Sequence, residues 1–357
     1  MQKKETKKRN YNIDFLRGVA TLCIILIHTA WWSGTGYMPT WFSNLTLLID
    51  VPVFMFIAGI SFNYVNSIIK NLKGLLVQWK KWLYFLVFYI LILLVFFRNS
   101  FVVEEILSWI VYLFPTITKI PVVGGSIWFM LMYIKVTIIC SIIICSINYF
   151  FKEKKLEILK IVTATMLMIF CYCSHDNELL IFDSYVSFYS FIYLLGYILH
   201  NYKIKDFKQF ALLECTNFII MILIFLACNL NINDIQNIKF PPSIPYLFFS
   251  LISIILFWYL KDNLNIKENN KIIYVGKTAI FFYFAQGVSS SFIYYIYPYL
   301  PFTNIVLKFI CMLLANIVLA TIGAIFLDKS YEYIRKKLKE IDLKKIFIPV
   351  LKEKKDV

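Results

Sequence analysis

Long apolar runs alternate with short polar segments along almost the whole chain. Most runs are about 20 residues long, the length that an α-helix needs to cross the hydrocarbon core of a bilayer. Such runs predict membrane-spanning helices, because lipid cannot hydrogen-bond an irregular backbone. Ten spans are expected, near residues 12–33, 41–68, 79–97, 127–150, 156–174, 182–200, 209–230, 243–261, 278–297 and 302–327. The pattern therefore predicts an all-α, polytopic integral membrane protein.

Two other segments have apolar positions without the pattern of a span. Residues 101–115 are too few to cross a bilayer, and we expect them to form an interfacial or re-entrant piece. The C-terminal segment is basic and partly amphipathic, which is typical of a helix on the membrane surface. We therefore expect a transmembrane domain at residues 1–330 and a basic cytoplasmic tail at residues 331–357.

The chain has 357 residues and a net charge of +15, which by itself would suggest a nucleic-acid partner. The basic residues, however, are divided unequally between the two sides of the predicted helix array. The N-terminal flank, the loops after even-numbered spans and the tail hold 29 of the 36 Lys and Arg residues, whereas the opposite loops hold Arg98, Lys119 and Lys239. Cytoplasmic loops are enriched in Lys and Arg, so we expect both termini in the cytoplasm, with these residues near anionic lipid headgroups. We expect a multi-pass protein of the cell membrane and no nucleic-acid partner.

The eight cysteines lie almost wholly within apolar runs and are expected to be small buried side chains. Cys171 and Cys173 form a C-x-C pair, but no second pair completes the ligand set of a zinc site. We therefore expect neither a metal nor a permanently bound cofactor.

The first span carries three ionisable side chains, Asp14, Arg17 and His28, in an otherwise apolar run. Such groups are costly in a membrane helix and are retained mainly where they act. Arg17 and His28 are eleven residues apart, which in a helix corresponds to about 16 Å along the axis and about 1100° of rotation, so both lie near one face. This spacing favours a reaction that extends across the bilayer. Lys135, in the middle of the fourth span, is a further candidate for function by its position alone.

The polar residues of the first span belong to a set of motifs. They are Asp14, the triplet Leu16-Arg17-Gly18, His28, and residues 51–59 (VPVFMFIAG), 126–130 (SIWFM) and 275–286 (VGKTAIFFYFAQ). In order and spacing these motifs resemble the membrane-bound acyltransferase 3 family, whose members transfer acyl groups to cell-surface glycans. Through the ten-span layout, the resemblance covers essentially the whole chain.

The resemblance implies that acyl-CoA is the donor, with acetyl as the expected acyl group, and that a glycan or lipid-linked sugar is the acceptor. His28 is then a general base for the acceptor hydroxyl or a covalent carrier of the acyl group, and the sequence leaves both open. Arg17 is expected to bind the CoA phosphates, to pair with Asp14 as structural support, or to do both. The other donor-side cations that we expect are Lys80, Lys81 and Lys277.

Two more residues are expected near the reaction. Asp50 precedes Pro52 in the second span and is expected either to fix the tautomer of His28 or to cap a helix break. Trp128, with Asp14, is expected to orient or support the site. We also expect one cavity that extends from Arg17 to His28 and has an outer opening near residues 33–37.

Two other functions compete with an acyltransferase. A transporter or flippase for lipid-linked sugar would use the same polar residues to line a pathway. An inactive relative that assists polysaccharide export is favoured by two departures from the family pattern, Ala58 in place of the usual serine and Gln286 in place of a common histidine. An acyltransferase of this layout could also pass its acyl group to a separate extracytoplasmic partner protein.

The charge asymmetry predicts the accessibility of the loops. A cysteine introduced near Asn177 should react with a membrane-impermeant thiol reagent added from outside, whereas one near Asn269 should not. Labelling of the two positions in whole cells tests the orientation, and the opposite labelling pattern would contradict it.

Overall fold

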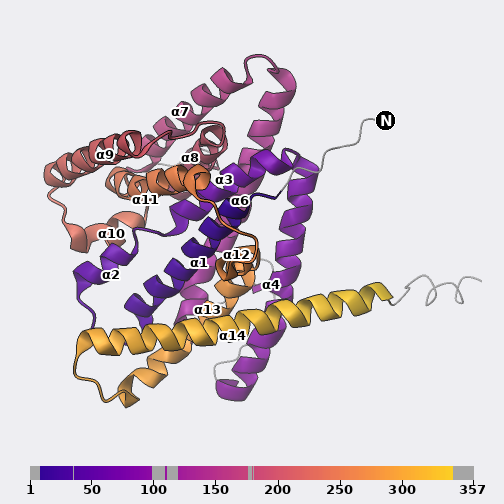
Figure 1. Cartoon of the computed structure of the whole chain (residues 1–357), viewed down its shortest axis with the longest axis vertical. Coiled ribbons are helices and arrows are strands. Elements are labelled where there is room, and N and C mark those ends of the chain that lie inside the picture. Colours follow the sequence, from indigo (N-terminus) through magenta and orange to yellow (C-terminus); the bar gives the residue numbers. More distant parts are fainter. Residues whose placement is uncertain are drawn as a thin grey trace, which may run out of the picture.

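The computed structural model describes residues 9–34, 36–98, 109–110, 120–175, 179 and 181–340. In these residues the chain forms a bundle of helices without any multi-residue strand (Figure 1). The helices are α1 (Tyr11–Trp32), α2 (Thr40–Thr46), α3 (Val51–Val65), α4 (Ile68–Phe96), α6 (Pro121–Phe150), α7 (Lys155–Cys173), α8 (Ser184–Leu199), α9 (Phe207–Ala227), α10 (Ile235–Lys239), α11 (Ile244–Asn263), α12 (Lys271–Lys277), α13 (Ala279–Ile296) and α14 (Ile305–Glu340), with the 3-10 helices η2 (Ile232–Asp234) and η3 (Tyr297–Tyr299).

The predicted all-α membrane fold is confirmed. Of the described segments, nine are long and apolar enough to cross a membrane, counting α2 and α3 as one. The sixth expected span, residues 182–200, forms α8, which has 16 residues and falls short of this length. Most of α8 is buried on every side, as expected of a helix that is apolar all round. The orientation of the helices in the membrane stays a prediction.

The second predicted span is two helices rather than one. α2 ends at Thr46, and α3 starts at Val51 with Pro52 in its first turn. Proline costs no hydrogen bond there, because backbone N–H groups of the first turn have no partner within the helix. Asp50 occupies the N-cap position of α3, but its side chain makes no capping hydrogen bond. The carboxylate is therefore not used to cap the helix break, one of the two roles expected for it.

α1 crosses the middle of the bundle and contacts α3 and α11 on one side and α12, α13 and α14 on the other (Figure 1). Two clusters of buried apolar side chains meet at this helix. The larger involves α3, α6, α7, α8 and α11, and the second involves α4, α13 and α14. Because α1 contributes residues to both clusters, its polar face lies where the two halves of the bundle adjoin.

Glycines permit the closest helix contacts. A Cβ atom on Gly18 of α1 would lie 2.2 Å from the carbonyl oxygen of Ile272, and one on Gly276 of α12 would lie 1.7 Å from that of Asp14. A second reciprocal pair, Gly59 of α3 and Gly196 of α8, has the same geometry, with 2.0 and 2.2 Å to backbone oxygens. Small residues at such crossings are the usual means by which membrane helices approach closely.

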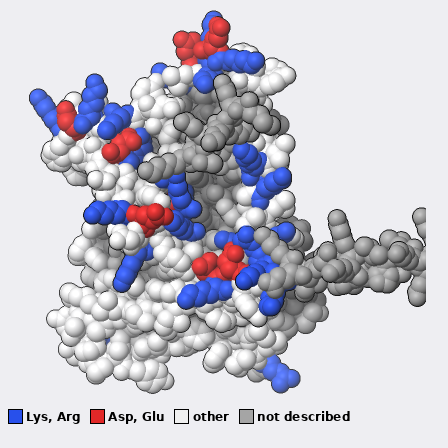
Figure 2. All heavy atoms as spheres, turned by 45° about the vertical axis from the view of Figure 1, so that its right-hand side comes forward, with Lys and Arg blue, Asp and Glu red and all other residues white. Residues whose placement is uncertain are grey.

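The charged side chains gather on part of the surface. Figure 2 shows Lys and Arg over the upper and central part of one face, whereas the lower left of the same view carries almost none. α14 continues without interruption past residue 330 to Glu340, so the boundary expected there falls within a helix. The remaining tail, 341–357, and nearly all of the expected interfacial piece at 101–115 lie outside the described residues.

The contact between α1 and α12 predicts the effect of a single methyl group. Gly276→Ala forces the two backbones apart and should lower the melting temperature of the purified protein, since overpacking costs about 1–3 kcal/mol. Gly74→Ala is the control, because a Cβ there meets nothing within 4 Å. Thermal unfolding in detergent measures both, and equal melting temperatures would contradict the contact.

Candidate active site

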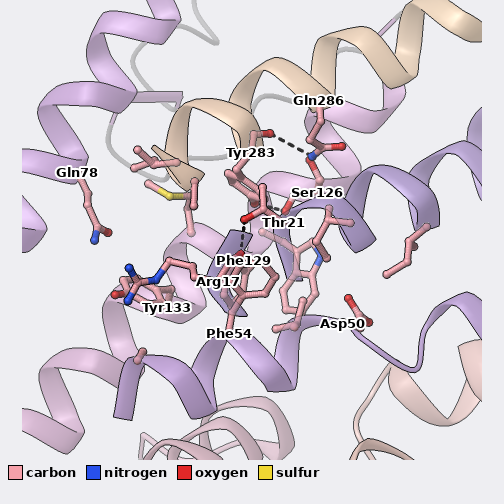
Figure 3. A pocket seen from close by; sticks show the side chains of 18 of the residues that line it. Arg17, Thr21, Asp50, Phe54, Gln78, Ser126, Phe129, Tyr133, Tyr283 and Gln286 are labelled. Atoms are coloured by element: carbon pink, nitrogen blue, oxygen red, sulfur yellow. Dashed lines mark hydrogen bonds between the residues drawn. The ribbon is translucent and has the colours of Figure 1, made fainter. Parts of the chain in front are cut away.

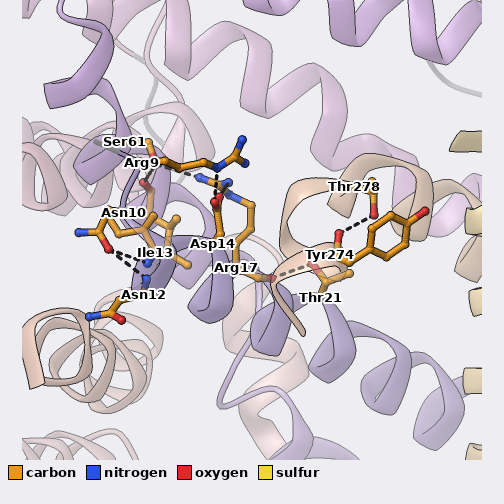
Figure 4. Close-up of polar contacts among 11 residues, drawn as sticks. Arg9, Asn10, Asn12, Ile13, Asp14, Arg17, Thr21, Ser61, Tyr274 and Thr278 are labelled. Atoms are coloured by element: carbon orange, nitrogen blue, oxygen red, sulfur yellow. Dashed lines mark hydrogen bonds and ion pairs between the residues drawn. The ribbon is translucent and has the colours of Figure 1, made fainter. Parts of the chain in front are cut away.

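The first polar cluster lies at the N-terminal end of α1 (Figure 4). The Asn10 side chain caps this helix by accepting hydrogen bonds from two backbone N–H groups of its first turn. One turn on, Asp14 is 5% exposed and binds two guanidinium groups, with Arg9 Nε at 2.5 Å and Arg17 Nη1 at 3.1 Å. Two cations on one carboxylate satisfy that buried anion and leave the cluster with a net positive charge.

Arg17 also connects α1 to α3. Its Nη2 donates to the Ser61 hydroxyl at 2.9 Å, and the side chain stays 28% exposed. A guanidinium has five N–H donors in a fixed fork, so bonds to Asp14 and Ser61 leave donors for a ligand. The two expected roles of Arg17 are therefore compatible, because the pairing with Asp14 orients the group without saturating it.

A cavity of about 620 Å³ extends along α1 (Figure 3). It is lined on this helix by Arg17, Thr21, Ile24, Ile27, His28, Trp31 and Trp32, which recur at the spacing of one helical face. The expected cavity shared by Arg17 and His28 is thus confirmed. None of the described residues at 33–37 lines the cavity, although the adjacent Trp32 does, and the Ser33 hydroxyl is paired with Tyr37 at 2.7 Å. An outer opening near this segment stays a prediction. The far end is lined by Trp32, Lys239 and Phe240.

His28 is held from one side by Gln286 of α13. Nδ1 of the imidazole lies 2.5 Å from the Gln286 side-chain oxygen Oε1. The amide is itself oriented, because its Nε2 donates to the Tyr283 carbonyl oxygen at 3.0 Å (Figure 3). An amide oxygen can only accept, so Nδ1 carries the hydrogen, and in the neutral ring the lone pair is on Nε2. No described residue bonds to Nε2.

A buried polar network supports this pair. Asn316 of α14 donates to Thr29 Oγ1 and to Ser290 Oγ, both at 2.9 Å, and accepts from Ser289 Oγ at 2.6 Å. Ser290 in turn lies 3.4 Å from Gln286 Oε1. These bonds join α1, α13 and α14 next to His28, so the imidazole is positioned by three helices rather than by its own helix alone.

The role of Gln286 was missed by the sequence analysis, which counted it only as a departure from the family pattern. The available signal was the position itself, where the resemblance implies a histidine, another side chain able to bond an imidazole. Nothing in the linear sequence connects residue 286 with residue 28, which are 258 positions apart.

Asp50 lines the same cavity but has other partners. Its Oδ2 lies 2.5 Å from Lys239 Nζ and accepts from the Tyr246 hydroxyl at 3.2 Å. The His28 ring is hydrogen-bonded to Gln286, so an influence of Asp50 on its tautomer stays a prediction. From the sequence, Lys239 is expected in an outer loop, and nothing there predicts this pairing, which joins two residues 189 positions apart.

The other expected residues divide into two groups. Lys81, Lys277 and Trp128 line the cavity, and the Lys81 ammonium lies 4.6 Å from the centre of the Phe281 ring. Lys80 and Lys135 are exposed and do not line the cavity. Lys80 lies on a different face of α4 from its neighbour Lys81. A donor-side role of Lys80 stays a prediction without a contact that favours it.

The site thus combines a cavity in a helical membrane protein with an arginine and an oriented histidine in its lining. A family model described as "Acyltransferase domain" matches residues 10–328. The chain therefore belongs to the acyltransferase 3 family, and the resemblance inferred from its motifs is confirmed. Comparisons with curated proteins and with solved structures gave no match.

Proposed function

We propose that this protein is an integral-membrane O-acyltransferase that moves an acyl group, expected to be acetyl, from acyl-CoA to a hydroxyl of a cell-surface glycan or lipid-linked sugar. The observation that carries the proposal is the cavity lined by both Arg17 and an imidazole whose Nδ1 is bonded to Gln286. Such an imidazole presents Nε2 as a base, next to a space large enough for a thin acyl chain.

The donor side is assigned to the Arg17 end of the cavity. Three cations line it there, and phosphate oxygens bind guanidinium and ammonium groups. The nucleotide of CoA would stay among Arg17, Lys81 and Lys277, while its uncharged pantetheine arm extends along α1. The distance of about 16 Å from Arg17 to His28 along the axis is within the reach of that arm. Under the predicted orientation, this end faces the cytoplasm, where acyl-CoA is made.

The chemistry requires His28 to accept one proton and then to give it up. Nε2 accepts the proton of the acceptor hydroxyl while its oxygen attacks the thioester carbonyl. Collapse of the tetrahedral intermediate breaks the C–S bond, and the leaving thiolate of CoA receives the proton from the imidazolium. In the alternative, Nε2 itself attacks the thioester and expels the thiolate of CoA. A hydroxyl of the acceptor, or of a separate extracytoplasmic partner, then attacks the acyl-imidazole, which frees Nε2, and the hydroxyl proton passes through solvent to the thiolate. Both routes need the hydrogen on Nδ1 and the lone pair on Nε2.

The two departures from the family pattern differ in how far they support the alternative that this protein is a catalytically inactive family member. Ala58 lines the cavity and removes a hydroxyl that most members have. Gln286, in contrast, supplies the acceptor that orients His28, so this substitution keeps a function for the position. A transport function has no comparable contact in its favour, since an oriented base is not needed to line a pathway.

The orientation of His28 by Gln286 predicts a graded series of variants. His28→Ala should lower acyl transfer by about 10²–10⁴-fold, the usual loss for a general base. Gln286→Leu removes the hydrogen-bond acceptor of Nδ1–H and should also lower the rate of acyl transfer. Gln286→Glu keeps such an acceptor and should therefore retain more activity than Gln286→Leu. CoA release from acetyl-CoA by purified protein measures the series. Activity of His28→Ala within a few-fold of wild type would overturn the proposed function.

The donor site makes a second prediction. Arg17→Lys keeps the charge but loses the fork, and should raise the KM for acetyl-CoA by about 10-fold or more, the effect of losing a charge-assisted bond. Lys81→Met should also raise this KM, and the adjacent Lys80→Met is the matched control because Lys80 lies outside the cavity lining. Equal effects of the Lys80 and Lys81 variants would contradict the assigned donor site.

A further inference from the structure

A buried ion pair stands at the end of the cavity away from Arg17. Asp50 and Lys239 are 3% and 6% exposed, and their Oδ2 and Nζ atoms are 2.5 Å apart. Both line the cavity, and Figure 3 shows Asp50 on the opposite side of the view from Arg17 and Gln78. Asp50 belongs to the start of α3 and Lys239 to the end of α10, so the pair joins two separate segments of the cavity wall.

The pair keeps unused bonding capacity. Tyr246 and Lys239 both bind Oδ2 of Asp50, and no described residue bonds to Oδ1. The Lys239 ammonium has three N–H donors, of which one is taken by Asp50, while the Phe240 ring lies 4.7 Å away. An acceptor oxygen and spare N–H donors are thus present side by side within a buried site.

A second buried lysine of the same protein, Lys261, provides a comparison, because its hydrogen bonds are those of a structural residue. Lys261 is 4% exposed, and its ammonium donates to the carbonyl oxygens of His200 and Tyr202 and to the carboxylate of Asp262. Three acceptors for three N–H groups leave nothing for a ligand. Among the described residues Lys239 has one such acceptor. A half-satisfied buried ion pair contributes little to stability, since apolar residues in its place are often as stable.

The wall beside the pair is aromatic. Trp128 packs edge-on against Phe240 with 5.4 Å between ring centres, and both line the cavity. Phe240 is 37% exposed, and Trp128 is half-buried. Aromatic faces next to a few fixed polar groups are the typical lining of a site that orients a small polar ligand.

We propose that Asp50 and Lys239 bind the acceptor, and that its chemical class is an uncharged sugar ring with two adjacent hydroxyls. One hydroxyl would donate to Asp50 Oδ1, and an N–H of Lys239 would donate to the oxygen of its neighbour, while an apolar face of the ring lies against Trp128 or Phe240. This inference rests on the proposed function, because it assigns the acceptor end of the same cavity.

The charge balance sets the specificity. The Lys239 cation is already neutralised by a carboxylate at 2.5 Å, so the pair offers no net positive charge to an anion. A uronic acid ring would bring a second carboxylate near Asp50, and like charges in a buried site are costly. The site therefore favours neutral hexosides over the corresponding hexuronides.

Binding of two matched probes tests the inference without relying on catalysis. Saturation-transfer NMR on the full chain in nanodiscs would compare methyl β-D-glucopyranoside with its C6 carboxylate analogue, methyl β-D-glucopyranosiduronate. We expect the neutral glycoside to bind the wild-type protein more tightly, by about 10-fold or more. Lys239→Met should weaken its binding to a similar extent. Lys308→Met is the matched control, because this lysine also lies over an aromatic ring but does not line the cavity.

The single variants leave one buried charge unpaired and can fail to fold. The double variant Asp50→Asn with Lys239→Met removes both charges together and should accumulate normally, yet bind the glycoside about 10-fold more weakly or worse. Undiminished binding by the double variant, equal binding of the two probes, or no binding of the glycoside to the wild-type protein would each overturn the inference. Failure of the proposed function is a separate result, since it is the absence of CoA release from acetyl-CoA by the wild-type protein.

Discussion

The backbone contact between Gly18 and Gly276 is the constraint on which the site depends. It fixes α12 against the N-terminal part of α1, and the chain then continues into α13 alongside the same helix. Ten residues further along each segment, His28 meets Gln286. The close contact and the hydrogen bond therefore share one register, and the orientation of the imidazole follows from how two helices lie together some three turns away.

The sequence alone was sufficient for the helical membrane fold and for the shared face of Arg17 and His28, because both follow from local periodicity and length. It was insufficient where the structure depends on a helix break or on a side chain from a distant part of the sequence. A proline in an apolar run was compatible with a kinked span, yet the chain forms α2 and α3 with Asp50 between them. Gln286 could not be paired with His28, because the choice of neighbouring helix is made by tertiary packing.

The cavity owes its shape to the division of the apolar core. Ile25 of α1 packs in the cluster of α4, α13 and α14, whereas Ile24 and Ile27 pack in the other cluster. The residues between these two faces of α1 point into the space where neither cluster closes. Each polar group along this stripe is then held by another helix, Arg17 by α3 and His28 by α13. Polar groups in an apolar bundle need such partners, and the same partners orient them.

The equal spacing of the two contacts restricts how the chain can change in length. Inserting one residue between Gly18 and His28 would turn the imidazole by about 100° and shift it by about 1.5 Å relative to α13. The contact with Gln286 would then be lost, although the composition and hydropathy of α1 would hardly differ. An insertion in one of the two segments is tolerable only with a matching insertion in the other, so these distant stretches of sequence behave as a single unit of fixed length.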